Sequence, residues 1–256
     1  MLRDLKGIYI IWLRDIKRFF RDKPHLISSI ARPSLYLFIL GSGLSSAFGT
    51  FGGRGGDWYM DFVYPGILGM IIIFTSLFSA VSIVWDREFG FLKEILVAPI
   101  SRTSIVIGKA LSGSTLSLFQ GIIMLFFAPL LRIQLNFFMV VKICLLILLT
   151  SFALTSLGIL IASKMKSMQG FQMIMNFLVM PMFFLSGAMF PLKDLPKWLE
   201  YLVSINPLSY SVDAIRYVML EDKIFLAHPL YMNILVISIF AVVMITLAIF
   251  VFNLTD

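Results

Sequence analysis

Six long apolar stretches alternate with polar and charged segments along the chain. The apolar stretches cover residues 26–48, 62–85, 110–131, 137–162, 171–190 and 230–253. A helix needs roughly 20 apolar residues to cross the hydrocarbon core of a bilayer, and it satisfies its own backbone hydrogen bonds there. The pattern therefore predicts an all-α integral membrane protein with six transmembrane helices.

The basic residues between these stretches fall mainly on segments that would share one side of the membrane. Counted together with Arg32, residues 1–25, 86–109 and 163–170 hold 14 lysines and arginines, whereas the opposite segments hold six. An excess of lysine and arginine marks the cytoplasmic side. Both termini are therefore expected in the cytoplasm, and the charged N-terminal segment predicts no removable signal peptide.

The composition agrees with this architecture. Hydrophobic residues make up 59% of the chain and charged residues 14%, whereas soluble domains have about 45–50% and about 25%. The net charge of +7 is carried beside the membrane stretches, so anionic membrane lipid is an expected partner and nucleic acid is not. The single cysteine, Cys144, lies in a membrane stretch and forms no internal disulfide. We expect one transmembrane domain over residues 1–256.

The first 25 residues have the two-sided pattern of an amphipathic helix. Apolar side chains recur at helical spacing at Ile8, Trp12, Ile16, Phe19 and Phe20, and basic side chains take the opposite side at Arg14, Lys17, Arg18 and Arg21. Such a helix is expected to lie in the membrane interface, with Trp12, Arg14, Lys17 and Arg18 as its interfacial residues. The alternative is a cytoplasmic flank whose charge only orients the first membrane helix.

Residues 86–109 are the most distinctive part of the chain. Four apolar residues would share one helical face there: Phe89, Leu92, Ile95 and Leu96. Pro99 would end a helix shortly afterwards. The spacing predicts a short amphipathic cytoplasmic helix over 86–98, and a solvated loop with incidental charges is the alternative.

The order of these elements resembles the membrane subunits of ABC-2 type transporters, the permeases that pair with a separate ATP-hydrolysing subunit. Such permeases have a charged N-terminal helix, six spans, and a motif after the second span that ends in a Gly-Lys pair. The matching residues are Glu88, Gly90, Ile95, Leu96, Pro99, Arg102, Gly108 and Lys109. A second matching block covers residues 181–216, so the resemblance extends over almost the whole chain.

The resemblance implies that residues 86–98 form a coupling helix seated in a groove of the ATPase. The residues implied in that contact are Arg87, Glu88, Phe89, Gly90, Leu92, Glu94, Ile95, Leu96 and Pro99. An apolar helix face suits such a groove, and Glu88 and Glu94 are expected to pair with basic residues of the partner.

The chain itself has no phosphate-binding loop. Its Gly-Lys pair at 108–109 follows Thr103 where the loop needs its first glycine, and it precedes Ala110 where Ser or Thr should hold magnesium. No catalytic residue and no metal site are expected, since His25 and His228 are predicted on opposite sides of the membrane without ligand clusters. ATP and magnesium are therefore expected on the partner ATPase, and no cofactor in this chain.

Two functions of other classes compete with this interpretation. An ion-coupled secondary transporter would usually bury acidic side chains in the membrane, but no Asp or Glu lies within the six predicted spans. Lys142 and Arg32 lie near span ends, where they can reach the interface. A membrane scaffold or secretion-pore component would give no reason for the pattern over 86–109.

Residues 191–229 are too long for a simple turn and mix aromatic residues with proline. Amphipathic rings favour the membrane interface, and the resemblance implies an external re-entrant helical hairpin between spans five and six. The residues expected in this gate are Pro191, Trp198, Pro207, Asp213 and Arg216. Asp213 and Arg216, three residues apart, would either pair with each other or lock the gate to a neighbouring element.

Six spans are half the usual complement of an ABC transporter, so the resemblance implies a second permease copy, identical or closely homologous, and two ATPases. Spans one, two and five would line a path along the dimer axis, with these candidates: Phe38, Phe74, Phe78, Met175, Phe177, Met180, Phe183 and Phe184. The expected function is export of an amphipathic drug, lipid or lipid-linked glycan across a prokaryotic inner membrane. The nearest resemblance is to the drug and nodulation-factor exporters.

Overall fold

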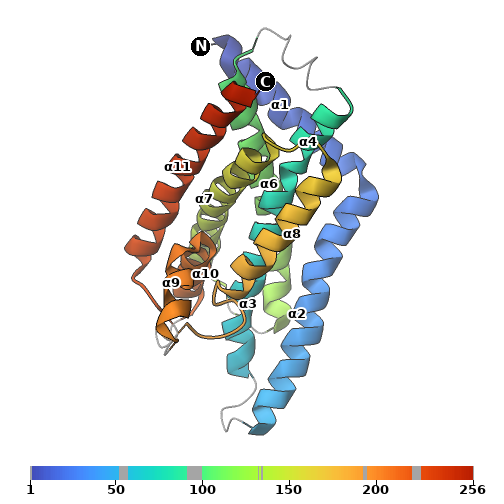
Figure 1. The fold of residues 1–256 in the computed structure, drawn as a ribbon. Coiled ribbons are helices and arrows are strands. Elements are labelled where there is room, and N and C mark those ends of the chain that lie inside the picture. Colours follow the sequence, from blue (N-terminus) through green and yellow to red (C-terminus); the bar gives the residue numbers. More distant parts are fainter. Residues whose placement is uncertain are drawn as a thin grey trace.

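A computed structural model describes residues 2–51, 57–90, 100–131, 133, 135–192, 195–220 and 226–255 (Figure 1). The regular elements in these ranges are helices. They are α1 (Leu2–Arg21), α2 (Lys23–Phe51), α3 (Asp57–Ser79), α4 (Val81–Glu88), α6 (Arg102–Phe127), the 3-10 helix η1 (Ala128–Leu131), α7 (Phe137–Ala162), α8 (Met168–Phe184), α9 (Lys197–Ile205), α10 (Pro207–Met219) and α11 (Leu230–Thr255).

Among the residues that the structure describes, four helical stretches are long and apolar enough to cross a membrane. They are Asp61–Glu88, Arg102–Leu130, Phe137–Ala162 and Leu230–Leu254. The prediction of an all-helical membrane protein is therefore confirmed. The first and fifth predicted spans correspond to α2 and α8, whose apolar parts, Leu26–Ile39 and Met168–Phe184, are shorter. The six-span count stays a prediction.

The helices form an elongated bundle with both chain termini at one end, here called the terminal end (Figure 1). α9 and α10 lie towards the other end, the hairpin end. α7 packs against α3, α6 and α11, and α10 packs against α3, α7 and α11. α8 packs against α3 and α4. The chain thus places the end of α4 and the helices α9 and α10 at opposite ends of one bundle (Figure 1).

α1 packs along α6 at the terminal end (Figure 1). Its buried side is a stripe with one residue per turn: Gly7, Ile11, Asp15 and Phe19. A helix is present here as predicted, but the stripe that faces the protein is not its apolar side, because this stripe includes an acid and leaves Phe20 exposed. Trp12 donates from Nε1 to the Thr115 hydroxyl at 3.0 Å. The location of α1 in the membrane interface stays a prediction.

The helix predicted over 86–98 is interrupted. α4 ends at Glu88, and Gly90 follows with φ of +82°, a left-handed conformation that costs a residue without Cβ almost nothing. Asp86, Arg87 and Glu88 therefore belong to the last turn of the second span. The other predicted coupling residues, Leu92, Glu94, Ile95, Leu96 and Pro99, lie outside the described residues.

The third span begins earlier than the apolar pattern indicated. Ser101 caps α6 by accepting a hydrogen bond from the Ser104 amide at 3.2 Å, so the helix starts at Arg102. Lys109, expected in the cytoplasmic segment, consequently lies two turns inside the helix and is only 2% exposed. A search for apolar stretches does not detect such a helix start, because polar residues occupy the first turn of the helix.

Gly108 allows the close contact between α1 and α6. A Cβ atom at this position would lie 3.0 Å from both the Ile8 carbonyl oxygen and the Ile11 Cβ atom. Any larger side chain would push the two helices apart, and overpacking of this kind costs about 1–3 kcal/mol.

We expect Gly108→Leu to loosen α1 from α6. Trypsin should cleave the basic residues of α1 faster in the purified protein, and its Tm should fall. The matched control is Ile122→Phe, which adds bulk at an exposed position of the same helix and should change neither measurement. Unchanged cleavage in Gly108→Leu would contradict this packing.

Candidate functional site

The terminal end contains a buried network of charged side chains centred on Lys109. The Lys109 ammonium donates to Asp15 Oδ2 at 3.2 Å, to Asp86 Oδ2 at 3.1 Å and to the Ser82 hydroxyl at 2.8 Å. An ammonium group has three donors, so each of them has an acceptor. Since these partners lie on α1 and α4, one side chain of α6 connects three helices.

Two arginines of α1 complete the network from its exposed side. Arg14 Nη2 lies 2.7 Å from Asp86 Oδ2 and 3.3 Å from Asp15 Oδ1. Arg18 Nη1 lies 3.6 Å from Asp86 Oδ1, and its guanidinium stands 5.0 Å over the Trp85 ring. Of the predicted interfacial residues, Arg14 and Arg18 therefore face a protein cluster, whereas Lys17 is exposed.

The network is stable because its buried positive and negative charges neutralise one another. Burial alone would lower the pKa of the Arg14 guanidinium, but the carboxylates of Asp15 and Asp86 raise that pKa above its ordinary value. Removing one partner of a buried ion pair typically costs about 3–5 kcal/mol, because the other charge stays buried without compensation. The relative positions of α1, α4 and α6 therefore depend on each member of the cluster.

Arg87 and Glu88, one turn or less further along α4, hold the junction between α7 and α8. Arg87 Nη1 donates to the carbonyl oxygens of Ala162 at 3.2 Å and Met165 at 2.7 Å. Glu88 Oε2 accepts a hydrogen bond from the Met168 amide at 3.0 Å. A cation thus meets the carboxyl end of α7 and an anion meets the amino end of α8, which is the favourable sign at each helix end. We call this pair of contacts the Arg87–Glu88 clamp.

The clamp changes the interpretation of the coupling residues. Glu88 was expected to pair with the ATPase, but the structure gives it a partner within the chain. Phe89 is 58% exposed and packs on the Trp85 ring, with centroids 4.8 Å apart. Of the described coupling residues, Glu88, Phe89 and Gly90 are exposed, and the pairing of Glu88 and Glu94 with an ATPase stays a prediction.

At the hairpin end, Arg216 of α10 is 1% exposed. It donates from Nη2 to the carbonyl oxygens of Gly187 at 2.8 Å and Phe62 at 3.3 Å, and its guanidinium lies 4.1 Å over the Phe62 ring. Arg216 thus ties α10 to the start of the second span and to the turn after α8.

Asp213, also buried, joins α10 to the approach to α11. Its carboxylate accepts hydrogen bonds from the amides of Ala227 at 3.0 Å and His228 at 2.9 Å, and from the Asn233 side chain at 2.9 Å. Of the two alternatives raised for Asp213 and Arg216, the structure shows bonds to neighbouring elements. Pro207 is buried with them, whereas Trp198 and Pro191 are exposed.

α10 is also bound to the end of α8. The Asn206 side chain donates to the Met182 carbonyl oxygen at 2.7 Å, and the Ser209 hydroxyl donates to the Leu185 carbonyl oxygen at 3.0 Å. Every residue of 206–216 is buried. α10 is therefore a buried helix that packs within the protein.

The predicted path residues divide between two environments. Met175 and Phe183 of α8 are buried, and Phe74 and Phe78 of α3 are partly buried with stacked rings 6.1 Å apart. Exposed positions are occupied by Phe38, Phe177, Met180 and Phe184. One copy of the chain therefore does not gather all eight around a common cavity.

Sequence reasoning missed two groups of polar residues. The first is the pair Gln172 and Asn176, one turn apart on the exposed side of α8, where the signal was two amides inside an apolar stretch. The second is the set Asp15, Asp86 and Lys109, where the signal was an acid at one-turn spacing from Ile11 and Phe19.

The described helices define an all-helical protein with several helices long and apolar enough to cross a membrane. The profile of the ABC-2 type transporter family matches residues 6–220. The protein ycf38 of Cyanophora paradoxa, named as a transport permease, is 35% identical over 209 residues, which are 79% of this chain and 71% of ycf38.

Two proteins of Escherichia coli K12 are also similar. The inner membrane transport permease YadH is 28% identical over 81% of this chain and 80% of its own. YbhR, whose name points to a multidrug ABC transporter permease, is 29% identical over 64% of this chain and 45% of its own. This chain belongs to the ABC-2 type transporter family.

The network can be tested through the stability of the purified protein. Asp86→Asn leaves Lys109, Arg14 and Arg18 with a single carboxylate, so we expect destabilisation by about 3 kcal/mol and a clear fall in Tm. Adding Lys109→Met removes the uncompensated buried cation and should restore part of that loss. Glu200→Gln, at an exposed position of α9, is the matched control. A Tm for Asp86→Asn equal to that of the unmodified protein would contradict the assignment.

Proposed function

We propose that this chain is the membrane-spanning permease of an ATP-driven ABC exporter. In this proposal six spans, formed by α2, α3 with α4, α6, α7, α8 and α11, cross a prokaryotic inner membrane with both termini in the cytoplasm. Two permease copies work with two separate ATPase subunits, which bind ATP and magnesium. Family membership supports the proposal, as does the name of YadH, an inner membrane transport permease.

The observation that carries the proposal is the arrangement around the last turn of α4. Asp86 belongs to the network that includes α1 and α6, whereas Arg87 and Glu88 hold the junction of α7 and α8. Three consecutive residues thus connect the start of the 86–98 segment to α1, α6, α7 and α8. A push on that segment by the ATPase would move these helices together.

α8 is the helix on which such a movement acts most directly, because Glu88 binds its first amide. Its exposed side carries the amides of Gln172 and Asn176. Amides exposed to hydrocarbon are unfavourable, so this side suits a second permease copy or a water-containing path. This supports a path along the dimer axis with α8 as one wall and Met180, one turn beyond Asn176, facing it.

The hairpin end closes the path in the structure's present state. α10 is joined by Arg216 to α3 and the turn after α8, and by Asp213 to α11. These bonds attach α10 to three other parts of the chain. Opening of the path to the outside therefore requires α10 to move together with α8. We propose export as the direction, as the family resemblance implies.

The cargo we propose is amphipathic: a drug, a lipid or a lipid-linked glycan. Exposed aromatic and methionine side chains on α8 adapt to ligands of different shape. The similarity to YbhR, whose name points to multidrug transport, supports the drug class. The ion-coupled carrier and the scaffold are not favoured by membership of the family.

The partner ATPase is the first thing to test. After gentle purification of the tagged chain from its native membrane, we expect a separate polypeptide with a phosphate-binding loop to accompany it in roughly equal amount, with ATPase activity. Repeated recovery of the permease without any ATPase would overturn the exporter proposal. Pre-treatment with excess detergent, which separates the subunits, is the control for specific association.

The role of Glu88 distinguishes transmission inside the permease from docking of the ATPase. Glu88→Gln weakens a charged hydrogen bond to the Met168 amide, worth about 1.5–3 kcal/mol. We expect the ATPase to be recovered normally and transport per ATP hydrolysed to fall about tenfold, since 1.4 kcal/mol corresponds to one factor of ten. The matched control is Glu200→Gln. Loss of ATPase recovery in Glu88→Gln would instead place Glu88 in the subunit interface.

A further inference from the structure

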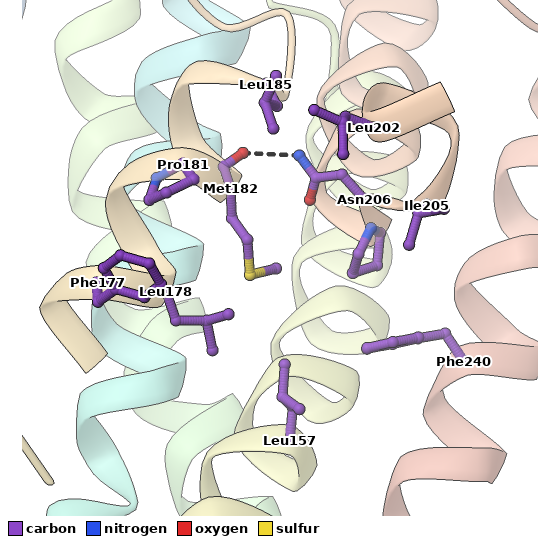
Figure 2. Close-up of a pocket in the computed structure, with 11 residues that line it drawn as sticks. Leu157, Phe177, Leu178, Pro181, Met182, Leu185, Leu202, Ile205, Asn206 and Phe240 are labelled. Carbon is purple, nitrogen blue, oxygen red and sulfur yellow. Dashed lines mark hydrogen bonds between the residues drawn. The ribbon is translucent and has the colours of Figure 1, made fainter. Parts of the chain in front are cut away.

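A cavity of about 340 Å³ lies beside α8 at the hairpin end of the bundle. Its walls come from four parts of the chain: Leu157 on α7, Phe177 and Met182 on α8, the turn between α9 and α10, and Phe240 on α11 (Figure 2). This volume falls within the range of small-molecule sites, about 300–1,000 Å³.

The lining offers nothing to a polar ligand. Asn206 is the polar side chain among the described residues that line the cavity, and both ends of its amide are engaged. Its nitrogen donates to the Met182 carbonyl oxygen, as Figure 2 shows, and its oxygen accepts from the Leu208 amide at 3.1 Å. A polar group placed here would lose its hydrogen bonds to water without replacement. The cavity therefore suits a hydrocarbon.

The cavity exists because α8 is short. Its 17 residues extend about 25 Å at 1.5 Å per residue, less than the roughly 30 Å of a hydrocarbon core. Beyond Phe184 the short helix α9 continues the wall beside α11. Because α8 ends at Phe184 and α9 begins only at Lys197, no continuous helix fills this side of the bundle, and a groove remains between α8 and α11.

One edge of the groove is formed by the helix best suited to contact lipid. α11 has the highest mean hydropathy of the four candidate spans, 3.1. Only 17% of its apolar stretch is buried inside the protein. The hydroxyls of Ser238 and Thr246 bond to carbonyl oxygens of their own helix. These two are the polar side chains of α11 between Ile234 and Phe252, so this exposed stretch has no side-chain hydrogen bond to offer a protein partner and suits lipid.

The opposite edge of the groove is equally apolar. Phe177 is 82% exposed, Ile205 is 78% exposed and Leu202 is also exposed. The amides Gln172 and Asn176 precede Phe177 on α8 and do not line the groove. The groove therefore opens on the lipid-facing side of α11, where lipid acyl chains surround the protein.

We propose that this groove binds one acyl chain of a membrane lipid from the leaflet at the hairpin end. The chain lies between α8 and α11 with its methyl end towards Leu157, and it fills the space that the short α8 leaves. The site goes beyond the proposed transport function, because it requires neither an ATPase nor a cargo. It places a lipid against the junction of α8 and α9, where a change of lipid would affect the movement of α8.

The test is photolabelling of the purified chain in lipid nanodiscs. The probe is a phosphatidylglycerol with a photoreactive diazirine near the end of one acyl chain, and peptide mapping locates the adducts. We expect severalfold more adducts per residue at Leu157, Leu178 and Met182 than on the exposed side of α11 around Val242 and Val243. Equal labelling of both regions would overturn the proposal.

Two variants test occupancy of the groove itself. Leu157→Trp fills its inner end, and Leu202→Trp fills it from the exposed edge without disturbing a buried position. Each should lower the groove adducts severalfold and leave those on α11 unchanged. Leu235→Trp, at an exposed position of α11 outside the groove, is the matched control and should leave groove labelling intact. Groove adducts that persist in both filling variants would contradict acyl-chain binding.

A second permease copy is the other candidate occupant, and it has its own signature. Phe177→Cys in a Cys144→Ala background would form disulfide-linked dimers on oxidation if a second copy covered the groove, and that result would overturn the proposal. Modification of the same cysteine by a lipid-soluble maleimide, without dimers, is the expected result. Because these assays use the permease alone, their failure leaves the exporter proposal standing, and absence of an ATPase leaves this site standing.

Discussion

The structure depends on a buried ammonium group. Lys109 lies inside α6 with its three donors directed at Asp15, Asp86 and Ser82. A charge in this position persists only because its acceptors are all present, and those acceptors belong to α1 and α4. The cluster therefore fixes how α1 lies on the bundle and where α4 ends. The Arg87–Glu88 clamp, one residue beyond Asp86, derives its position from the same cluster.

Polar side chains hold the two ends of the bundle. At the terminal end the bonds run among α1, α4 and α6 and on to the junction of α7 and α8, and at the hairpin end they run from α10 to α3, α8 and α11. α8 is attached at both ends, through its first amide to Glu88 and through Met182 and Leu185 to α10. It is therefore the helix best placed to carry a displacement from one end to the other.

In a single copy of the chain, α8 also leaves much of its surface without a protein neighbour. One residue per turn faces the bundle, Phe171, Met175, Val179 and Phe183, and the remaining faces are exposed. Two amides and several large apolar side chains share those faces. A helix with this division needs different neighbours on different sides. A second permease copy suits the amides, and an acyl chain suits the groove beside α11.

The sequence by itself determined the elements and the family. Apolar length and hydropathy are local properties, so the helices of four spans and the N-terminal helix could be predicted. The order of motifs around Glu88, Gly90 and Lys109 was sufficient to indicate an ABC-2 permease. The end of α4 at Gly90 and the early start of α6 were missed, because an apolar average does not register a left-handed residue or a capping serine.

Only the tertiary structure decided which charges meet. Asp15 and Lys109 are 94 residues apart, and Arg87 bonds carbonyls 75 and 78 residues away. Each of these side chains, taken alone, resembles an ordinary flanking charge with water as its partner. Whether such a charge is solvated or buried depends on which helices approach it, and that is set by close packing over the whole bundle, as at Gly108, and by no feature of its own neighbours in the chain.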